Sequence, residues 1–143
     1  MKRTAILHVL VLALALLLTA CTSNGDTVER FAEAAPGSGE SINIPGYEAL
    51  TFKADSRLQK VYLPNPKENA AYFVMTLTLE DGEMLWTGKE LYPGEAFTQI
   101  ALTRSFKAGE YAAKLHYDCF SVSDNEPLNG AEVKLNLTVH ETE

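Results

Sequence analysis

The chain has 143 residues, a formal net charge of -7 and a hydrophobic fraction of 46%. At about 100 to 200 residues per domain, this length allows one modest domain with tails and excludes a multidomain enzyme or a polytopic membrane protein. Because 19 Asp and Glu residues outnumber 12 Lys and Arg residues, no nucleic-acid partner is expected. Two cysteines are too few for a disulfide-rich scaffold.

Residues 1–20 have the pattern of a secretory signal peptide. Lys2 and Arg3 precede an apolar run that only His8 interrupts, and small residues close the segment. The segment is followed directly by a cysteine, Cys21. We therefore expect export of the chain.

The sequence Leu18-Thr19-Ala20-Cys21 resembles the lipobox of bacterial lipoproteins. The resemblance implies cleavage between Ala20 and Cys21. It also implies that the thiol of Cys21 carries a diacylglyceryl group, with acyl chains such as palmitate. Two or more acyl chains give stable anchoring, whereas a single chain is marginal. We expect a protein on the outer face of the bacterial cytoplasmic membrane, attached through this lipid. The alternative is an uncleaved signal anchor in which the cysteine is incidental.

Residues 21–40 predict a flexible acidic tether that is rich in Gly and Ser. Phe31 is the only aromatic residue in this stretch, so it has little apolar surface to bury. Pro36 and Gly37 also oppose regular structure.

From Ser41 onward the chain consists of short alternating runs separated by turn residues. In residues 72–79 one face carries Phe73, Met75, Leu77 and Leu79, and Asp81-Gly82 then predicts a hairpin turn before a return strand at residues 84–87. Pro93-Gly94 predicts a second turn before a strand at residues 96–102.

Residues 111–119 and 133–139 alternate most regularly, which indicates strands with one buried face. Shorter strands are expected at 42–44, 50–52 and 58–63. The seven or eight strands, with no helical period among them, predict an all-β domain over residues 41–143. A β-sandwich is the favoured architecture and a small barrel is the alternative.

Two resemblances support the sandwich. Tyr117-Asp118-Cys119 with Trp86 on an earlier strand resembles the immunoglobulin-type pattern, and residues 106–111 (FKAGEY) resemble the loop in which Tyr111 would supply a corner hydrogen bond. Because Cys21 is expected to carry the lipid, Cys119 has no second cysteine with which to form an inter-sheet disulfide, and no such disulfide is expected.

Residues 44–139 also resemble small secreted lipoproteins of Gram-positive anaerobic bacteria, through LTFKAD, YFVMTLTLEDG, LW, PGEAF, AGEY, YDCFSV and PLNGAEV. That resemblance implies location and an immunoglobulin-like fold, and no activity.

The reactive side chains do not assemble into a catalytic pattern. Cys119 has inward parity and is expected to be a buried free thiol, whereas His116 projects to the opposite face. If Phe120 lies opposite Glu132, His116 and His140 are too far apart to share zinc. The acidic stretches containing Glu80, Asp81 and Glu83, and Asp118, Asp124 and Glu126, lack the regular spacing of a calcium loop, although calcium binding stays open. We therefore expect no enzyme activity, no cofactor and no metal.

The aromatic residues are the remaining candidates. Trp86, Phe73, Tyr111 and Tyr117 are expected in the core. Tyr47, Tyr62, Tyr72 and Tyr92 have outward parity or lie beside turns, and Tyr62, Tyr72 and Tyr92 form the candidate interface.

We expect a non-catalytic recognition or scaffold module that binds a surface or secreted protein. An extracellular inhibitor or accessory subunit of a hydrolase, using the hairpin at residues 79–84, is one alternative. A carbohydrate-binding module is another. The sequence leaves open the identity of the partner, the oligomeric state and which face of the sheet is functional.

Overall fold

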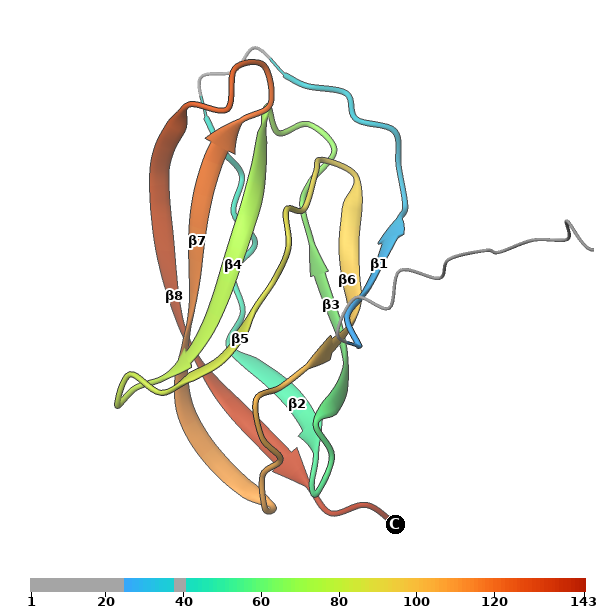
Figure 1. The fold of residues 1–143 in the computed structure, drawn as a ribbon, viewed down its shortest axis with the longest axis vertical. Helices are drawn as coiled ribbons and strands as arrows, with labels where there is room; N and C mark the ends of the chain where they lie inside the picture. Colours follow the sequence, from blue (N-terminus) through green and yellow to red (C-terminus); the bar gives the residue numbers. More distant parts are fainter. Residues whose placement is uncertain (1–24, 38–40) are drawn as a thin grey trace, which may run out of the picture.

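The longest strands of the protein are β7 (Gly109–Ser121) and β8 (Pro127–His140), which pair antiparallel in the computed structural model (Figure 1). The structure describes residues 25–37 and 41–143. The other strands of these residues are β1 (Thr27–Arg30), β2 (Ala49–Lys53), β3 (Leu58–Pro64), β4 (Ala71–Leu79), β5 (Met84–Thr87) and β6 (Glu95–Ala101). The prediction of an all-β chain is confirmed. The described residues contain no helix that is long and apolar enough to cross a lipid bilayer.

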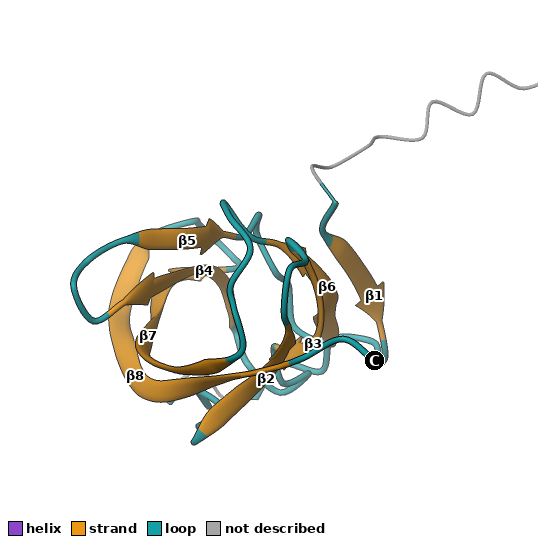
Figure 2. Cartoon of the chain, turned by 90° about the horizontal axis from the view of Figure 1, so that it is seen from below, coloured by secondary structure: helices purple, strands orange, loops and turns teal. Residues whose placement is uncertain are grey.

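The strands form two sheets, which face one another in Figure 2. The larger sheet has the order β2-β8-β7-β4-β5, and the smaller has the order β1-β6-β3. Neighbouring strands are antiparallel except for β2, which runs parallel to β8. The predicted β-sandwich of immunoglobulin-like type is therefore confirmed, with β3 and β6 in the positions of strands B and E and with β4, β7 and β8 in those of C, F and G.

Strand β1 corrects the prediction of a tether over residues 21–40. Its backbone pairs with β6 from Thr27, opposite Gln99, to Arg30, opposite Glu95. The side chain of Val28 packs against the core, and Arg30 forms an ion pair with Glu95 at 2.9 Å. The N-terminal segment thus fills the sheet edge beside β6, which strand D occupies in an immunoglobulin domain. Residues 1–24 and 38–40, including the predicted signal peptide, Ala20 and Cys21, lie outside the described residues.

Residues 42–44 are the second difference, because they do not form the predicted strand. The backbone amide of Asn43 donates instead to the side-chain oxygen of Asn69 at 2.8 Å, and the side chain of Asn69 returns a hydrogen bond to the carbonyl of Asn43 at 2.9 Å. A side-chain amide therefore satisfies this backbone in place of a neighbouring strand.

The core consists of the side chains that the alternating hydrophobic pattern of the strands predicts to be buried. The inward residues of β4, which are Phe73, Met75, Leu77 and Leu79, are 0 to 9% exposed, and the inward residues of β7 and β8 meet them between the sheets. The smaller sheet contributes Leu63, Phe97 and Ile100. The ring of Trp86 packs edge-on against Phe97 with centroids 4.9 Å apart, which connects β5 to the opposite sheet.

The loop before β7 contains the expected corner. The hydroxyl of Tyr111 donates to the backbone carbonyl of Lys107 at 2.9 Å, and its ring packs edge-on against Phe106. This bond closes the turn that leads into β7, as in the tyrosine corner of immunoglobulin-like domains. The corner hydrogen bond implied by the resemblance is therefore present.

Candidate interaction surface

Three aromatic side chains stack on the outer face of the larger sheet. Tyr72 on β4 lies directly opposite Phe120 on β7, and their rings stack with centroids 5.3 Å apart and planes 18° apart. The ring of Tyr92 covers the other side of Tyr72 at 5.0 Å. We call Tyr72, Tyr92 and Phe120 the aromatic stack. Because its neighbours cover it, Tyr72 is only 6% exposed although it points outward from the sandwich.

The loop that carries Tyr92 is tied to the sandwich by buried hydrogen bonds. The side-chain amide of Asn65 donates to the carbonyls of Ala71 at 2.9 Å and Leu91 at 3.0 Å. The backbone amide of Tyr92 donates to the carboxylate of Glu95 at 2.9 Å. The stack is therefore held by rigid elements, which is the arrangement expected of a preorganised contact surface.

The hydroxyl of Tyr92 donates to a carboxylate oxygen of Glu90 at 2.9 Å. This hydrogen bond, with smaller effects of desolvation and of nearby carboxylates, raises the pKa of Tyr92 above its ordinary value. The hydroxyl of Tyr92 presents a polar edge beside the apolar rings. An open hollow of about 680 Å³ adjoins this edge and is lined by Val28, Val74, Gly88, Lys89, Glu90, Tyr92 and Glu95.

The same end of the sandwich exposes further apolar side chains. Val122 follows β7 and Leu128 lies in β8, and each is 41% exposed. Phe120 is paired across the strands with Pro127. The aromatic stack thus lies beside the hairpin between β7 and β8, which carries these two exposed apolar side chains together with Asp124 and Glu126.

Tyr62 is separated from the other two predicted interface residues. It lies on β3 in the smaller sheet, where it is 56% exposed. Its ring makes an edge contact with Phe31, with centroids 5.5 Å apart. The structure therefore joins Tyr72 and Tyr92 with Phe120, and it pairs Tyr62 with a residue that the sequence assigned to the tether.

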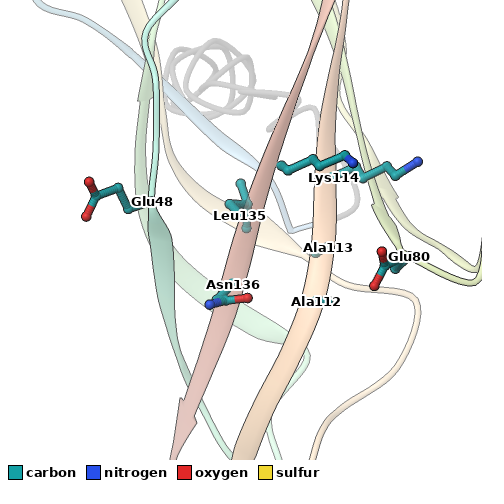
Figure 3. A pocket seen from close by; sticks show the side chains of 8 residues that line it. Glu48, Glu80, Ala112, Ala113, Lys114, Leu135 and Asn136 are labelled. Carbon is teal, nitrogen blue, oxygen red and sulfur yellow. The ribbon is translucent and has the colours of Figure 1, made fainter.

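A depression of about 230 Å³ lies further along the outer face of β7 and β8, over the small side chain of Ala112 (Figure 3). Its lining includes Glu48, Glu80, Lys114 and Lys134. In Figure 3, Glu48 and Glu80 lie on opposite sides of the two strands. Their carboxylates do not converge on a common point, so this depression does not present a pair of acids for general acid-base chemistry.

Cys119 is a buried free thiol, as expected, with 2% of its surface exposed. Burial and the nearby carboxylate of Asp118 raise the pKa of this thiol to about 11. His116 lies on the outer face, where its Nε2 atom is 3.2 Å from a carboxylate oxygen of Asp118. Neither histidine of the described residues, His116 or His140, is therefore placed to activate this thiol.

The register between β7 and β8 differs from the expected one. His116 lies opposite Glu132, whereas the register considered from the sequence, with Phe120 opposite Glu132, would put His116 opposite Asn136. His140 lies at the far end of β8 and is paired with Lys53 of β2. The two histidines are thus far apart along the sheet in the observed register as well.

The aspartate carboxylates of the two acidic hairpins accept hydrogen bonds within their own turns. Asp81 accepts a hydrogen bond from the amide of Glu83 at 2.9 Å, and Asp124 accepts one from the amide of Glu126 at 3.1 Å. The carboxylate of Glu83 receives two hydrogen bonds from the guanidinium of Arg104, at 2.8 and 3.0 Å. Among residues 25–37 and 41–143, no group of three or more His, Cys, Asp or Glu residues is placed to hold a metal ion.

Phe120 and Phe31 are the site residues that sequence reasoning missed. Phe120 shares the outward parity of His116 on β7, but its neighbour on β4 depends on the register between the strands. Phe31 was missed because the residues around it have the polar composition of a linker.

Comparison of the chain with protein-family models and with curated proteins finds no significant match.

Proposed function

We propose that the protein is a lipid-anchored, non-catalytic recognition domain of the bacterial cell surface that binds a protein partner through the aromatic stack. The observation that supports this most directly is the alignment of Tyr92, Tyr72 and Phe120 on a rigid sheet face. Aromatic residues are enriched in protein interfaces, where they contribute large contact areas at little cost in side-chain entropy.

The ordered state of the stack favours binding. The rings of Tyr92 and Phe120 remain partly accessible, and the buried ring of Tyr72 lies between them. A partner would therefore meet rings that are already held in place, so few rotamers have to be frozen on association. The exposed Val122 and Leu128 extend the apolar surface toward the hairpin.

The test is capture of a partner by the full-length protein, carrying a tag after Glu143, from the surface of the source cells. The double variant Tyr92→Ala, Phe120→Ala is expected to lose the captured protein. The control is Tyr62→Ala, which removes an exposed aromatic side chain from the smaller sheet. Equal recovery by the two variants, or recovery of a polysaccharide in place of a protein, would overturn the proposal.

The anchor has its own test. Mass spectrometry of the wild-type protein is expected to show the lipid mass, and the variant Cys21→Ala is expected to lack it. A wild-type protein without lipid would refute the anchor and leave the aromatic stack to be judged by the capture experiment.

A second candidate is an inhibitor or accessory subunit of a secreted hydrolase. It is favoured by the turn between β4 and β5, which projects from the sandwich in both overall views (Figures 1 and 2). Met84 beside this turn is 53% exposed. If this candidate is right, Met84→Asp abolishes capture of the hydrolase while the double variant of the stack retains it.

A further inference from the structure

The described part of the chain begins close to the predicted lipid anchor. Three residues, 22–24, separate Cys21 from Gly25. Four Cα–Cα steps reach at most about 15 Å. Since the lipid of Cys21 would hold that residue at the headgroups, Gly25 lies within this distance of the membrane surface. This step depends on the anchor in the proposed function.

Gly25 and Asp26 are firmly attached to the sandwich. The side-chain amide of Gln99 donates to the carbonyl of Gly25 at 2.7 Å. The carboxylate of Asp26 accepts hydrogen bonds from the amide of Ala101 at 2.9 Å and from the indole of Trp86 at 2.8 Å. The point at which the chain leaves toward the anchor is therefore part of the folded domain, so the anchor constrains the orientation of the domain.

This exit point lies beside Leu58, the first residue of β3. A side chain at Gly25 would come within 2.8 Å of a methyl group of Leu58, so the two residues are in close contact. Leu58 is 50% exposed. It also lines an open groove of about 430 Å³ between β2 and β3, together with Lys53, Lys60, His140 and others.

Exposed cations surround Leu58. Lys53, Arg57 and Lys60 are all exposed, and the ion pairs found among the described residues include none of them. The Nε atom of Arg57 donates to the carbonyl of Leu102 at 2.8 Å, which holds its guanidinium at this end. Among nearby acids, Asp55 is paired with Lys107 at 2.7 Å, and Glu141 also lines the groove. This basic surface is notable on a chain with a formal net charge of -7.

The aromatic stack lies at the other end of the sandwich. Phe120 is paired with Pro127 at the start of β8, whereas His140 at the end of β8 lines the groove beside Leu58. At about 3.4 Å per residue, the two ends of this strand are about 40 Å apart. The hairpin next to the stack carries the carboxylates of Asp124 and Glu126.

We infer that Lys53, Arg57, Leu58 and Lys60 form a membrane-facing surface that contacts an anionic phospholipid bilayer. The short connection to Cys21 brings this surface to the headgroups, and lysine and arginine residues there are attracted to anionic lipids. That attraction decays over a Debye length of about 8 Å at physiological ionic strength, so it acts only on groups held this close. The domain then stands on the membrane with the aromatic stack directed outward.

The test uses the full-length lipidated protein in vesicles of phosphatidylcholine and phosphatidylglycerol in equal amounts. An environment-sensitive fluorophore is attached to Leu58→Cys or, as the matched control at the far end, to Val122→Cys. The native thiol of Cys119 is buried and is not labelled in the folded protein. Brominated lipids are expected to quench the probe at position 58 and to leave the probe at position 122 bright. Equal quenching at both positions would overturn the inference.

The charge requirement is tested in the Leu58→Cys background by Lys53→Glu, Arg57→Glu and Lys60→Glu together. These changes are expected to reduce quenching in the anionic vesicles, as replacing phosphatidylglycerol by phosphatidylcholine should also do. Lys134→Glu, on the outer face of the larger sheet, is the control for a charge reversal away from this surface and should leave the quenching unchanged. Undiminished quenching in the triple variant would refute the role of charge.

Mass spectrometry of the same samples separates the two possible failures. Absence of the lipid on Cys21 would refute both the anchor and the orientation that depends on it. Presence of the lipid with equal quenching at the two positions would refute only the orientation.

Discussion

The indole Nε1 atom of Trp86 donates a hydrogen bond of 2.8 Å to a carboxylate oxygen of Asp26. The bond joins β5 of the larger sheet to the residue that precedes β1 of the smaller sheet. The other oxygen of Asp26 accepts the backbone amide of Ala101 at the end of β6. A single carboxylate therefore connects three parts of the sandwich, which makes the N-terminal segment a structural element of the domain.

Replacement of Asp26 by Ala is expected to lower the free energy of unfolding by about 2 kcal/mol, because hydrogen bonds to a charged acceptor are lost and two donors are left without it. Urea denaturation of the wild type and the variant measures this difference. Glu29→Ala on the exposed side of β1 is the control, with an expected change within about 0.5 kcal/mol. Equal losses in the two variants would show that the carboxylate of Asp26 is unimportant.

Replacement of Gly94 by Ala is expected to cost about 3 kcal/mol, since it adds a steric collision to an unfavourable backbone conformation. Gly94 has a φ angle of 88°, and a Cβ atom there would collide with the carbonyl group of Ala32. Gly82 has a similar φ of 95° with no atom within 4 Å of the added Cβ. Gly82→Ala is therefore expected to cost only about 1 kcal/mol. Thermal and urea denaturation compare the two, and similar costs would argue against close packing of the N-terminal segment on the 93–94 turn.

Replacement of Tyr111 by Phe is expected to cost about 1 kcal/mol, the usual net contribution of one hydrogen bond. The variant keeps the ring contact with Phe106 and removes only the bond to the carbonyl of Lys107. Tyr92→Phe is the comparison, because its hydroxyl bonds to an exposed carboxylate, and its cost should be within about 0.5 kcal/mol. A Tyr111→Phe protein as stable as the wild type in urea would show that the corner bond is dispensable.

Stability is expected to fall as the pH rises above 9. Burial raises the pKa of Cys119 from 9.0 to about 11 and that of Tyr47 from 10.0 to about 12. Between the ordinary and the raised pKa of each group, the folded state therefore binds more protons than the unfolded state. The stabilisation is complete below pH 9 for Cys119 and below pH 10 for Tyr47, and it is lost as the pH approaches each folded-state value. Each group contributes a slope of at most about 1.4 kcal/mol per pH unit.

Urea denaturation from pH 7 to 12 tests this dependence. Cys119→Ala should flatten the decline between pH 9 and 11, and Tyr47→Phe should flatten it between pH 10 and 12. The hydroxyls of Tyr47 and Tyr117 are both buried and lie beside one another. Burial raises the pKa of Tyr117 as well, so the Tyr47→Phe variant is expected to keep part of the decline above pH 10. Unchanged slopes in both variants would contradict the assignment.

The strands and the face that each one buries were predictable where alternation is regular. Ala113, Leu115, Tyr117 and Cys119 are buried as the pattern of residues 111–119 indicates, and the turn at Asp81-Gly82 joins β4 and β5 as expected. These features depend on backbone geometry that repeats every two residues, so neighbours in the sequence are sufficient to reveal them.

Strand β1 was not predictable in the same way. Its four residues carry a single core contact, through Val28, and their strand conformation is stabilised by pairing with β6 and by the hydrogen bonds of Asp26. The composition of the surrounding residues is that of a linker. A short edge strand of this kind has too little apolar surface of its own to be recognised before its partner is known.

We could derive the all-β class, the buried faces of the long strands and the nomination of Tyr72 and Tyr92 without the fold, because parity along a strand is a local property. The fold was needed to show that Phe120 completes the aromatic stack, that Tyr62 pairs with Phe31, and that the N-terminal segment belongs to the sandwich. Each of these depends on which strand lies beside which and in what register, and that choice is made by packing between residues that are distant in the sequence.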